Sequence, residues 1–473
     1  MSITIAGILF FAYLLYLLLE AKLTFYNLFV FTLFCEMYIE IGYAIQIGGF
    51  INYRTIAEFV LFLFCLNNIN LRAIPNRILV AYVTLMIALV IPVLQLFFFP
   101  SDQLVAIVGN EWDKILVEGA SPKHPVLNGY VVQMLIQFGI QGIVLIYILT
   151  NFKKMSYLRL MCKIDRMINF MLILGLLEFV VVSIFRQNEL WGTFKLGVFG
   201  FSEGTYWTNR MRAGLFELTL FTKETSHYAN VLLYSFFFKS AYNVLIKKRL
   251  IDKYLILNLF IMAVGMSFTS LLCAFCIFVV LMAYRWRILK PSTLRYEQAL
   301  IMFSVLLLLI LFSTIVSTLN SEGFFSRRIV SLIEEIDIVT SNMWMLPGVD
   351  SLEWSNRVRL LSIYQTLLAF IHRPLFGYGI GAVCCHGATA MMLAGCGVIG
   401  LYVWSKFVFF SQPLIKIYRP EKVGYLISFL MFLFVTIFYS NGVKAFYELS
   451  AIMLAISFCV IFSKRKKCKY YIL

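Results

Sequence analysis

Ionisable side chains are scarce in this sequence. Charged residues make up only 14% of the 473 residues, histidine occurs four times, and 61% of the residues are hydrophobic. So few histidines argue against a metal centre. The sequence also has no P-loop and no DxD-type metal motif. We therefore expect neither a metal nor a cofactor.

Long runs without any charge are present instead, for example Ile3 to Leu19, Ile78 to Phe99 and Ala299 to Val316. A helix needs about 20 apolar residues to cross the hydrocarbon core of a bilayer. The sequence therefore predicts an all-α polytopic membrane protein with about 12–14 transmembrane helices. An outer-membrane barrel is excluded because its short segments would alternate in hydropathy. The expected spans lie near residues 3–20, 24–48, 55–70, 78–99, 130–150, 167–185, 226–246, 254–267, 269–284, 299–317, 388–409, 425–440 and 446–462.

The positive charges are unevenly placed. The net charge is +16, and more than half of the 40 Lys and Arg fall in short loops on one predicted side of the membrane. This positive-inside pattern orients a membrane protein and suits an anionic cytoplasmic leaflet, so it argues against nucleic acid as the partner. We expect the first apolar segment to be retained, because it lacks a basic n-region and an A-x-A cleavage site. The basic loops and tail are residues 72–77, 153–166, 247–253, 285–295, 416–422 and 464–469.

The alternation of sides leaves three long segments on the outer face, residues 100–129, 186–225 and 318–387. Loops of this kind commonly carry function in polytopic proteins, and we expect them to form a partly helical cap. The predicted organisation has four parts. They are N-terminal membrane helices (1–129), central membrane helices with the outer loop 186–225 (130–317), a large outer loop (318–387), and C-terminal membrane helices with a basic tail (388–473).

Two of these outer loops each contribute a pair of arginines, Arg210 with Arg212 and Arg357 with Arg359. Arginine keeps its charge and binds phosphate or pyrophosphate through two parallel hydrogen bonds. If the segments are helical, members of a pair point about 200° apart, so one of each pair can face a cavity. The alternative is that the arginines lie at the membrane interface with their head groups in water.

Candidate acid–base residues stand beside these arginines. Glu224 and His227 are three residues apart at the start of a predicted span, and either could act as a general base. Capping of the helix N-terminus is the alternative role. We interpret the glycines at 377, 379 and 381, which follow Arg373-Pro374, as a turn with close backbone approach. Structural pairing is the expected role for most acids inside predicted spans, namely Glu36, Glu40, Glu58, Glu178 and Glu448.

Several short motifs resemble those of the bacterial O-antigen and capsule repeat-unit polymerases of the Wzy type, which are similar to the O-antigen ligases. Residues 223–229 (KETSHYA) resemble the E-P-S-x-[FY]-A element, and residues 266–270 (MSFTS) resemble an S-x-[ST] hairpin. Asn356-Arg357 with residues 373–381 resembles the core of the family's large outer loop. His386 with residues 397–401 (GVIGL) resembles the element that follows it. The resemblance covers roughly residues 205–405, and Thr225, Gly387 and Gly395 depart from the family pattern.

The resemblance implies a lipid-donor glycosyltransferase fold in the bacterial cytoplasmic membrane, with its active site facing outward. It implies polymerisation of undecaprenyl-diphosphate-linked oligosaccharides, with undecaprenyl diphosphate as the leaving group. Arg210 and Arg357 are the first candidates to bind the diphosphate, and Arg212 and Arg359 are second candidates. Glu224, His386 and His227 are the catalytic candidates on the acceptor side. Membrane lipids and a chain-length regulator are the other expected partners.

Three alternatives stay open. An O-antigen ligase would use the same donor and transfer the glycan to lipid A-core. A lipid-linked oligosaccharide flippase would have repeat-related helices and cations deep in a central cavity. A structural partner of a biosynthetic complex would leave the paired outer arginines unexplained.

Overall fold

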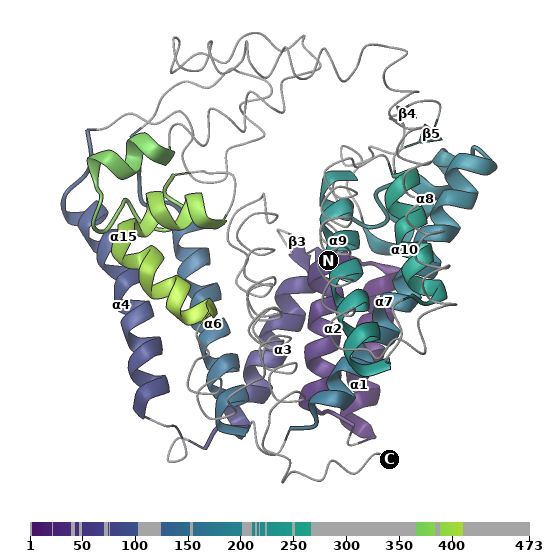
Figure 1. Ribbon diagram of the computed structural model, residues 1–473, viewed down its shortest axis with the longest axis horizontal. Helices are drawn as coiled ribbons and strands as arrows, with labels where there is room; N and C mark the ends of the chain where they lie inside the picture. Colours follow the sequence, from purple (N-terminus) through teal and green to yellow (C-terminus); the bar gives the residue numbers. More distant parts are fainter. Residues whose placement is uncertain are drawn as a thin grey trace, which may run out of the picture. The chain divides into compact units, whose positions relative to one another are not determined.

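A computed structural model of the chain is mostly helical (Figure 1). The chain divides into two compact units. The first comprises Met1–Leu61 and Leu158–Gly323, and the second comprises Phe62–Tyr157 and Phe324–Leu473. The first boundary between them along the chain falls within α3 (Tyr53–Asn68). The structure describes residues 2–20, 22–38, 43–46, 50–70, 74, 76–102, 124–151, 155–200, 211–212, 215–216, 218–222, 225–247, 251–265, 366–383 and 388–409.

The first unit begins with two apolar helices and a small sheet. Thr4 caps α1 (Ile5–Leu19), because its hydroxyl accepts a hydrogen bond from the Gly7 backbone N–H at 3.0 Å. α2 (Phe25–Tyr38) follows, and three short strands pair in the antiparallel order β1-β2-β3. The strands are β1 (Ser2–Ile3), β2 (Tyr43–Gln46) and β3 (Phe50–Asn52), with Ile3 opposite Ile45 and Ile45 opposite Ile51.

The expected span at residues 24–48 was wrong in its second half. The helix ends at Tyr38, and the chain then enters strand β2. β-branched and aromatic residues such as Tyr43 and Ile45 suit a strand as well as an apolar helix, so hydropathy alone did not distinguish the two.

α9 is deeply buried in the first unit, because its residues from Val231 to Tyr242 are buried throughout. α9 (Thr225–Tyr242) packs against α10 (Lys253–Val264) and against α2. Other elements are α7 (Tyr157–Phe179), α8 (Asn188–Phe199) and the hairpin of β4 (Met211–Arg212) with β5 (Leu215–Phe216). π-Helical turns extend α7 and α9, namely η2 (Val180–Ile184) after α7 and η5 (Asn243–Lys247) after α9.

The second unit contains α4 (Asn76–Phe98), α6 (Gly129–Asn151) and α15 (Ala388–Phe409). α4 contacts both α6 and α15 (Figure 1). α4 exposes large apolar side chains such as Phe97 and Phe98, as expected of a helix that faces lipid.

Among the described residues, three helices are long and apolar enough to cross a membrane, namely Leu79–Phe98, Gly129–Ile148 and Tyr157–Ile184. Ile5–Leu19, Phe25–Tyr38, Lys253–Val264 and Thr389–Ser405 are shorter apolar helices. The helical, membrane-associated character predicted from the sequence is thereby supported. The expected spans at 269–284, 299–317, 425–440 and 446–462 and most of the loop 318–387 lie outside the described residues.

Candidate functional site

A buried carboxylate at the C-terminal end of α7 organises the chain that leads into α9. Glu178 is 1% exposed, and its Oε1 accepts a hydrogen bond from the Trp191 indole N–H at 2.9 Å. Its Oε2 accepts from the Leu220 backbone N–H at 2.7 Å, and Oε1 is also 3.4 Å from the Thr219 backbone N. One side chain on α7 therefore binds α8 and the segment 218–222.

Lys195 on α8 completes this cluster. Its Nζ lies 3.4 Å from Glu178 Oε1 and donates to the Thr219 hydroxyl at 2.7 Å. Burial lowers the pKa of Lys195 from its usual value, while the neighbouring Glu178 acts in the opposite direction. A buried ammonium is tolerated here because a carboxylate pairs with it and a hydroxyl accepts a hydrogen bond from it.

The segment 218–222 is held in a defined turn. Leu220 has a positive φ of 47°, which a non-glycine residue rarely adopts without support. The Thr222 backbone N–H and hydroxyl both donate to the Thr219 carbonyl, at 2.9 and 2.7 Å. α9 begins at Thr225, three residues beyond this turn, where the sequence predicted the start of a span.

His227 lies in the first turn of α9 and is half-buried. Its neighbour Tyr228 is buried, and among the described residues no partner accepts or donates a hydrogen bond to the Tyr228 hydroxyl. Gly175 of α7 faces that hydroxyl closely, because a Cβ at this glycine would overlap it. The start of α9 is thus packed directly against α7.

The predicted site residues are only partly placed. Arg212 lies in strand β4, opposite Leu215. Because Arg212 is in a strand, the helical arrangement considered for the pair Arg210 and Arg212 does not apply at Arg212. Arg210, Glu224, Arg357, Arg359 and His386 lie outside the described residues.

The glycine motif at residues 377–381 of the second unit allows two backbone segments to pack closely. α15 is broken at Gly397, where φ is 62° and ψ is −165°. The chain at 373–381 lies against this break. The Tyr378 and Gly379 backbone N–H groups donate to the carbonyls of Ala394 and Gly395, at 3.0 and 2.7 Å.

Two further bonds run in the opposite direction, because the N–H groups of Val398 and Ile399 donate to the carbonyls of Pro374 and Leu375. A Cβ at Gly377 or at Gly397 would lie about 2.5 Å from backbone atoms of the other segment. The prediction of a turn with close backbone approach is therefore confirmed for residues 373–381.

Arg373 is occupied by structural contacts. One of its guanidinium nitrogens donates to the Phe99 carbonyl at 3.1 Å, and the guanidinium stacks 4.8 Å from the centre of the Tyr378 ring. It holds the turn next to the end of α4.

Acids within predicted spans are paired where they are described. Arg54 lies 2.9 Å from Glu36 and 3.5 Å from Glu58, and Glu178 pairs with Lys195. Structural pairing, which the sequence favoured for these acids, is confirmed for all three. Glu40 and Glu448 lie outside the described residues.

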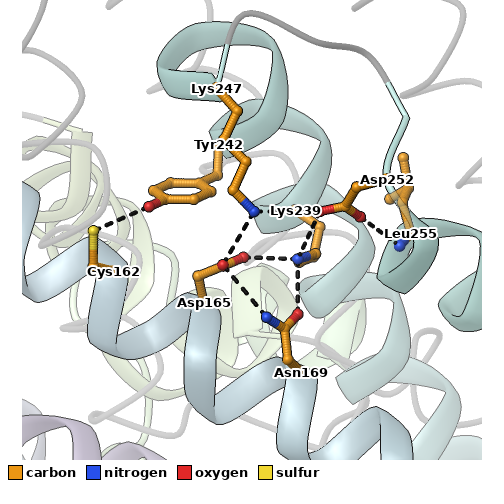
Figure 2. A network of polar contacts seen from close by, with 8 residues as sticks. All are labelled: Cys162, Asp165, Asn169, Lys239, Tyr242, Lys247, Asp252 and Leu255. Atoms are coloured by element: carbon orange, nitrogen blue, oxygen red, sulfur yellow. Dashed lines mark hydrogen bonds and ion pairs between the residues drawn. The ribbon is translucent and has the colours of Figure 1, made fainter.

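A further buried charge cluster joins α7, α9, η5 and the start of α10 (Figure 2). Lys239, which is fully buried, lies 2.7 Å from Asp165 and 3.2 Å from Asp252, and it donates to Asn169 at 2.8 Å. Lys247 lies 3.2 and 3.3 Å from the same two aspartates. Two ammonium groups thus neutralise two carboxylates.

Asp252 also caps α10, because its Oδ1 accepts from the Leu255 backbone N–H at 2.9 Å (Figure 2). Burial acts to raise the pKa of Asp252, but Lys239, the Leu255 N–H and Lys247 outweigh it and hold that pKa below its usual value. Beside this cluster, the thiol of Cys162 lies 3.1 Å from the Tyr242 hydroxyl (Figure 2).

The sequence interpretation did not identify Trp191, Lys195 or the cluster around Lys239. Lys239 offered a signal, since it is a lone lysine within an apolar helix. The sequence offered no such signal for Trp191 or Lys195, because only the fold brings these residues close to Glu178.

No group of three or more potential metal ligands occurs among the residues that the structure describes. Comparison with protein-family models, curated proteins and solved structures found no match to this chain.

Proposed function

We propose that this chain polymerises undecaprenyl-diphosphate-linked oligosaccharide repeat units on the outer face of the bacterial cytoplasmic membrane. In this proposal it is a multi-pass glycosyltransferase with about 12–14 membrane helices, and the outer segments 186–225 and 318–387 form its active face. The product would be an O-antigen, capsule or exopolysaccharide chain.

The observation that carries the proposal is the contact between two segments that resemble polymerase motifs. Residues 373–381 resemble the core of the family's large outer loop, and residues 397–401 resemble the element after it. The four backbone hydrogen bonds described above join these segments, and Gly377 and Gly397 permit their close approach. This contact between the two segments supports the proposal.

The third motif supports the same proposal. Residues 223–229 resemble the element that opens a span, and α9 begins at Thr225. His227 is in its first turn, and the preceding turn at 218–222 is held by Glu178 and Lys195. A candidate acid–base element is therefore attached to a rigid support, which catalysis requires.

The proposed reaction needs no metal. The acceptor sugar hydroxyl attacks the anomeric carbon of the donor, and the bond between that carbon and the diphosphate oxygen breaks. The electron pair leaves with undecaprenyl diphosphate, and the hydroxyl proton passes to Glu224, His227 or His386. Arg357 and Arg210, with Arg359 and Arg212 as second candidates, would stabilise the growing negative charge on the diphosphate.

The test is polymer formation in a bacterium whose own polymerase gene is deleted and which carries this gene with its cognate repeat-unit pathway. The wild-type chain should restore a ladder of surface glycan, and Arg357→Ala should abolish it. Arg186→Ala is the control, because Arg186 is an exposed arginine in the other predicted outer segment, 186–225, and should leave the ladder intact.

Two results would refute the proposal. One is a full ladder from Arg357→Ala, which would remove the central diphosphate contact. The other is lipid-linked polymer that accumulates when the gene is deleted in its native host, because that phenotype indicates a ligase. Single-repeat surface glycan in the same deletion would support a polymerase.

A further inference from the structure

We infer that Glu178, together with Lys195, is a positioning residue for the start of α9, and that it sets the rate of glycosyl transfer by holding the turn at residues 218–222. This inference rests on the proposed function, because that function assigns acid–base roles to Glu224 and His227 immediately after the turn.

The hydrogen-bond pattern around Glu178 requires a carboxylate. Four donors converge on its two oxygens, namely the Trp191 indole N–H, the Lys195 ammonium and the backbone N–H groups of Thr219 and Leu220. A carboxylate only accepts hydrogen bonds, whereas a glutamine amide offers one acceptor and two donors. Glu178→Gln therefore places an NH₂ group against at least one of these donors.

The turn itself depends on this side chain. Leu220 adopts a positive φ of 47°, and its N–H is bound by Glu178 at 2.7 Å. Strained backbone of this kind persists only where its surroundings enforce it. Without the carboxylate, the turn can relax to an ordinary conformation, and the start of α9 would shift with it.

The position of Glu178 excludes direct contact with an external substrate as its role. It is 1% exposed, and its oxygens are occupied by the four donors. Its effect on chemistry must therefore pass through the turn. Small displacements of an acid–base group can cost about 100-fold in rate.

The matched control is Glu36, a carboxylate that is also 1% exposed and also paired, with Arg54 at 2.9 Å. Glu36→Gln and Glu178→Gln each remove one buried negative charge from the same unit. A purely structural role predicts that both lower thermal stability and active yield in the same manner. The positioning role predicts that only Glu178→Gln changes the kinetics of the folded enzyme.

The first experiment measures polymerisation by purified protein with its lipid-linked repeat unit. For folded Glu178→Gln we expect kcat to fall at least tenfold with the donor KM within twofold of wild type. Glu178→Asp, which keeps the carboxylate, should recover part of kcat, and Glu36→Gln should keep the wild-type kcat per folded molecule.

The second experiment reads the turn without using activity. Thr222 is 3% exposed, and a cysteine there keeps the backbone N–H bond to the Thr219 carbonyl, so the cysteine of Thr222→Cys should react slowly with a membrane-impermeant maleimide. Adding Glu178→Gln should accelerate labelling at position 222 at least tenfold, as read by peptide mass spectrometry. Adding Glu36→Gln should leave the labelling rate unchanged.

The outcomes separate the two proposals. Faster labelling together with a lower kcat supports the inference. Unchanged labelling, or faster labelling with a wild-type kcat, overturns it while the polymerase proposal stands. If the wild-type chain makes no polymer, the proposed function fails, and the positioning role for transfer falls with it whatever the labelling shows.

Discussion

Replacement of Lys239 by methionine should be among the most destabilising single changes in the described part of the chain. The Lys239 ammonium is fully buried and contacts three acceptors, Asp165, Asn169 and Asp252, at 2.7, 2.8 and 3.2 Å. Methionine fills a similar space but carries no charge. The substitution leaves two aspartates close to a single remaining ammonium, that of Lys247.

The magnitude follows from burial. Removing one partner of a buried, hydrogen-bonded ion pair costs about 3–5 kcal/mol, because the other charge is left without compensation. Lys247 contacts the same aspartates, but its side chain is 24% exposed, so water can replace it. Lys247→Met should therefore cost about 1 kcal/mol or less.

The assay is equilibrium unfolding of the purified protein in detergent micelles, with Lys253→Met as the control. Lys253 is the exposed first residue of α10 and should change the free energy of unfolding by less than about 0.5 kcal/mol. Asp165→Asn combined with Lys239→Met should cost less than the sum of the two single variants, since the members of one network couple. Equal effects of Lys239→Met and Lys253→Met would refute the assignment of Lys239 as the centre of this cluster.

Three further predictions concern other positions. The pKa of Asp252 is lowered in the folded state, so the stability that it contributes should be present above pH 3.8, its ordinary pKa, and should be lost as the pH falls below it. The difference in melting temperature between wild type and Asp252→Asn should therefore shrink from pH 7 to pH 3. A constant difference would contradict this. Gly397→Ala should destabilise the protein by at least about 1–2 kcal/mol, because φ is positive there and a Cβ would overlap the Leu375 backbone. Gly139→Ala is the control in the same thermal melt. A Cβ at Gly139 within α6 would lie in open space, so this variant should have neutral or increased stability. Arg373→Ala should keep polymer formation within about twofold of wild type in the complementation assay, because its bond to the Phe99 carbonyl is exposed and its role is structural; loss of polymer would show that Arg373 binds substrate.

Much of the helical framework could be predicted from hydropathy. The expected spans at 78–99 and 130–150 correspond to α4 and α6 within two residues at each end, since long apolar runs bounded by polar residues leave few alternatives. The span at 24–48 failed in its second half, because a short apolar strand and an apolar helix have the same composition. Local pattern therefore identifies long helices reliably and short strands poorly.

The candidate site was harder to predict, because its contacts are made between distant parts of the chain. The turn at Gly377 to Gly381 was predictable from its glycines alone, but its partner at Gly397 required the fold. Glu178 was recognised as a buried acid, whereas its donors on Trp191, Lys195 and Leu220 come from positions 13 to 42 residues away. Sequence can identify a charge that needs a partner, but the fold supplies that partner.

The charge clusters around Glu178 and around Lys239 share one helix, α7. α7 carries Asp165 in its N-terminal half and Glu178 near its C-terminus, which at 1.5 Å per residue are about 20 Å apart. The residues between Arg166 and Glu178 carry no charge, and each carboxylate is neutralised by a lysine from another helix, Lys239 or Lys195. A helix paired at both ends of its apolar stretch cannot slide along its axis without breaking a buried ion pair. α7 therefore holds the turn at 218–222 in a fixed position through Glu178. A substitution at Asp165 should weaken this support without changing any contact of the turn itself.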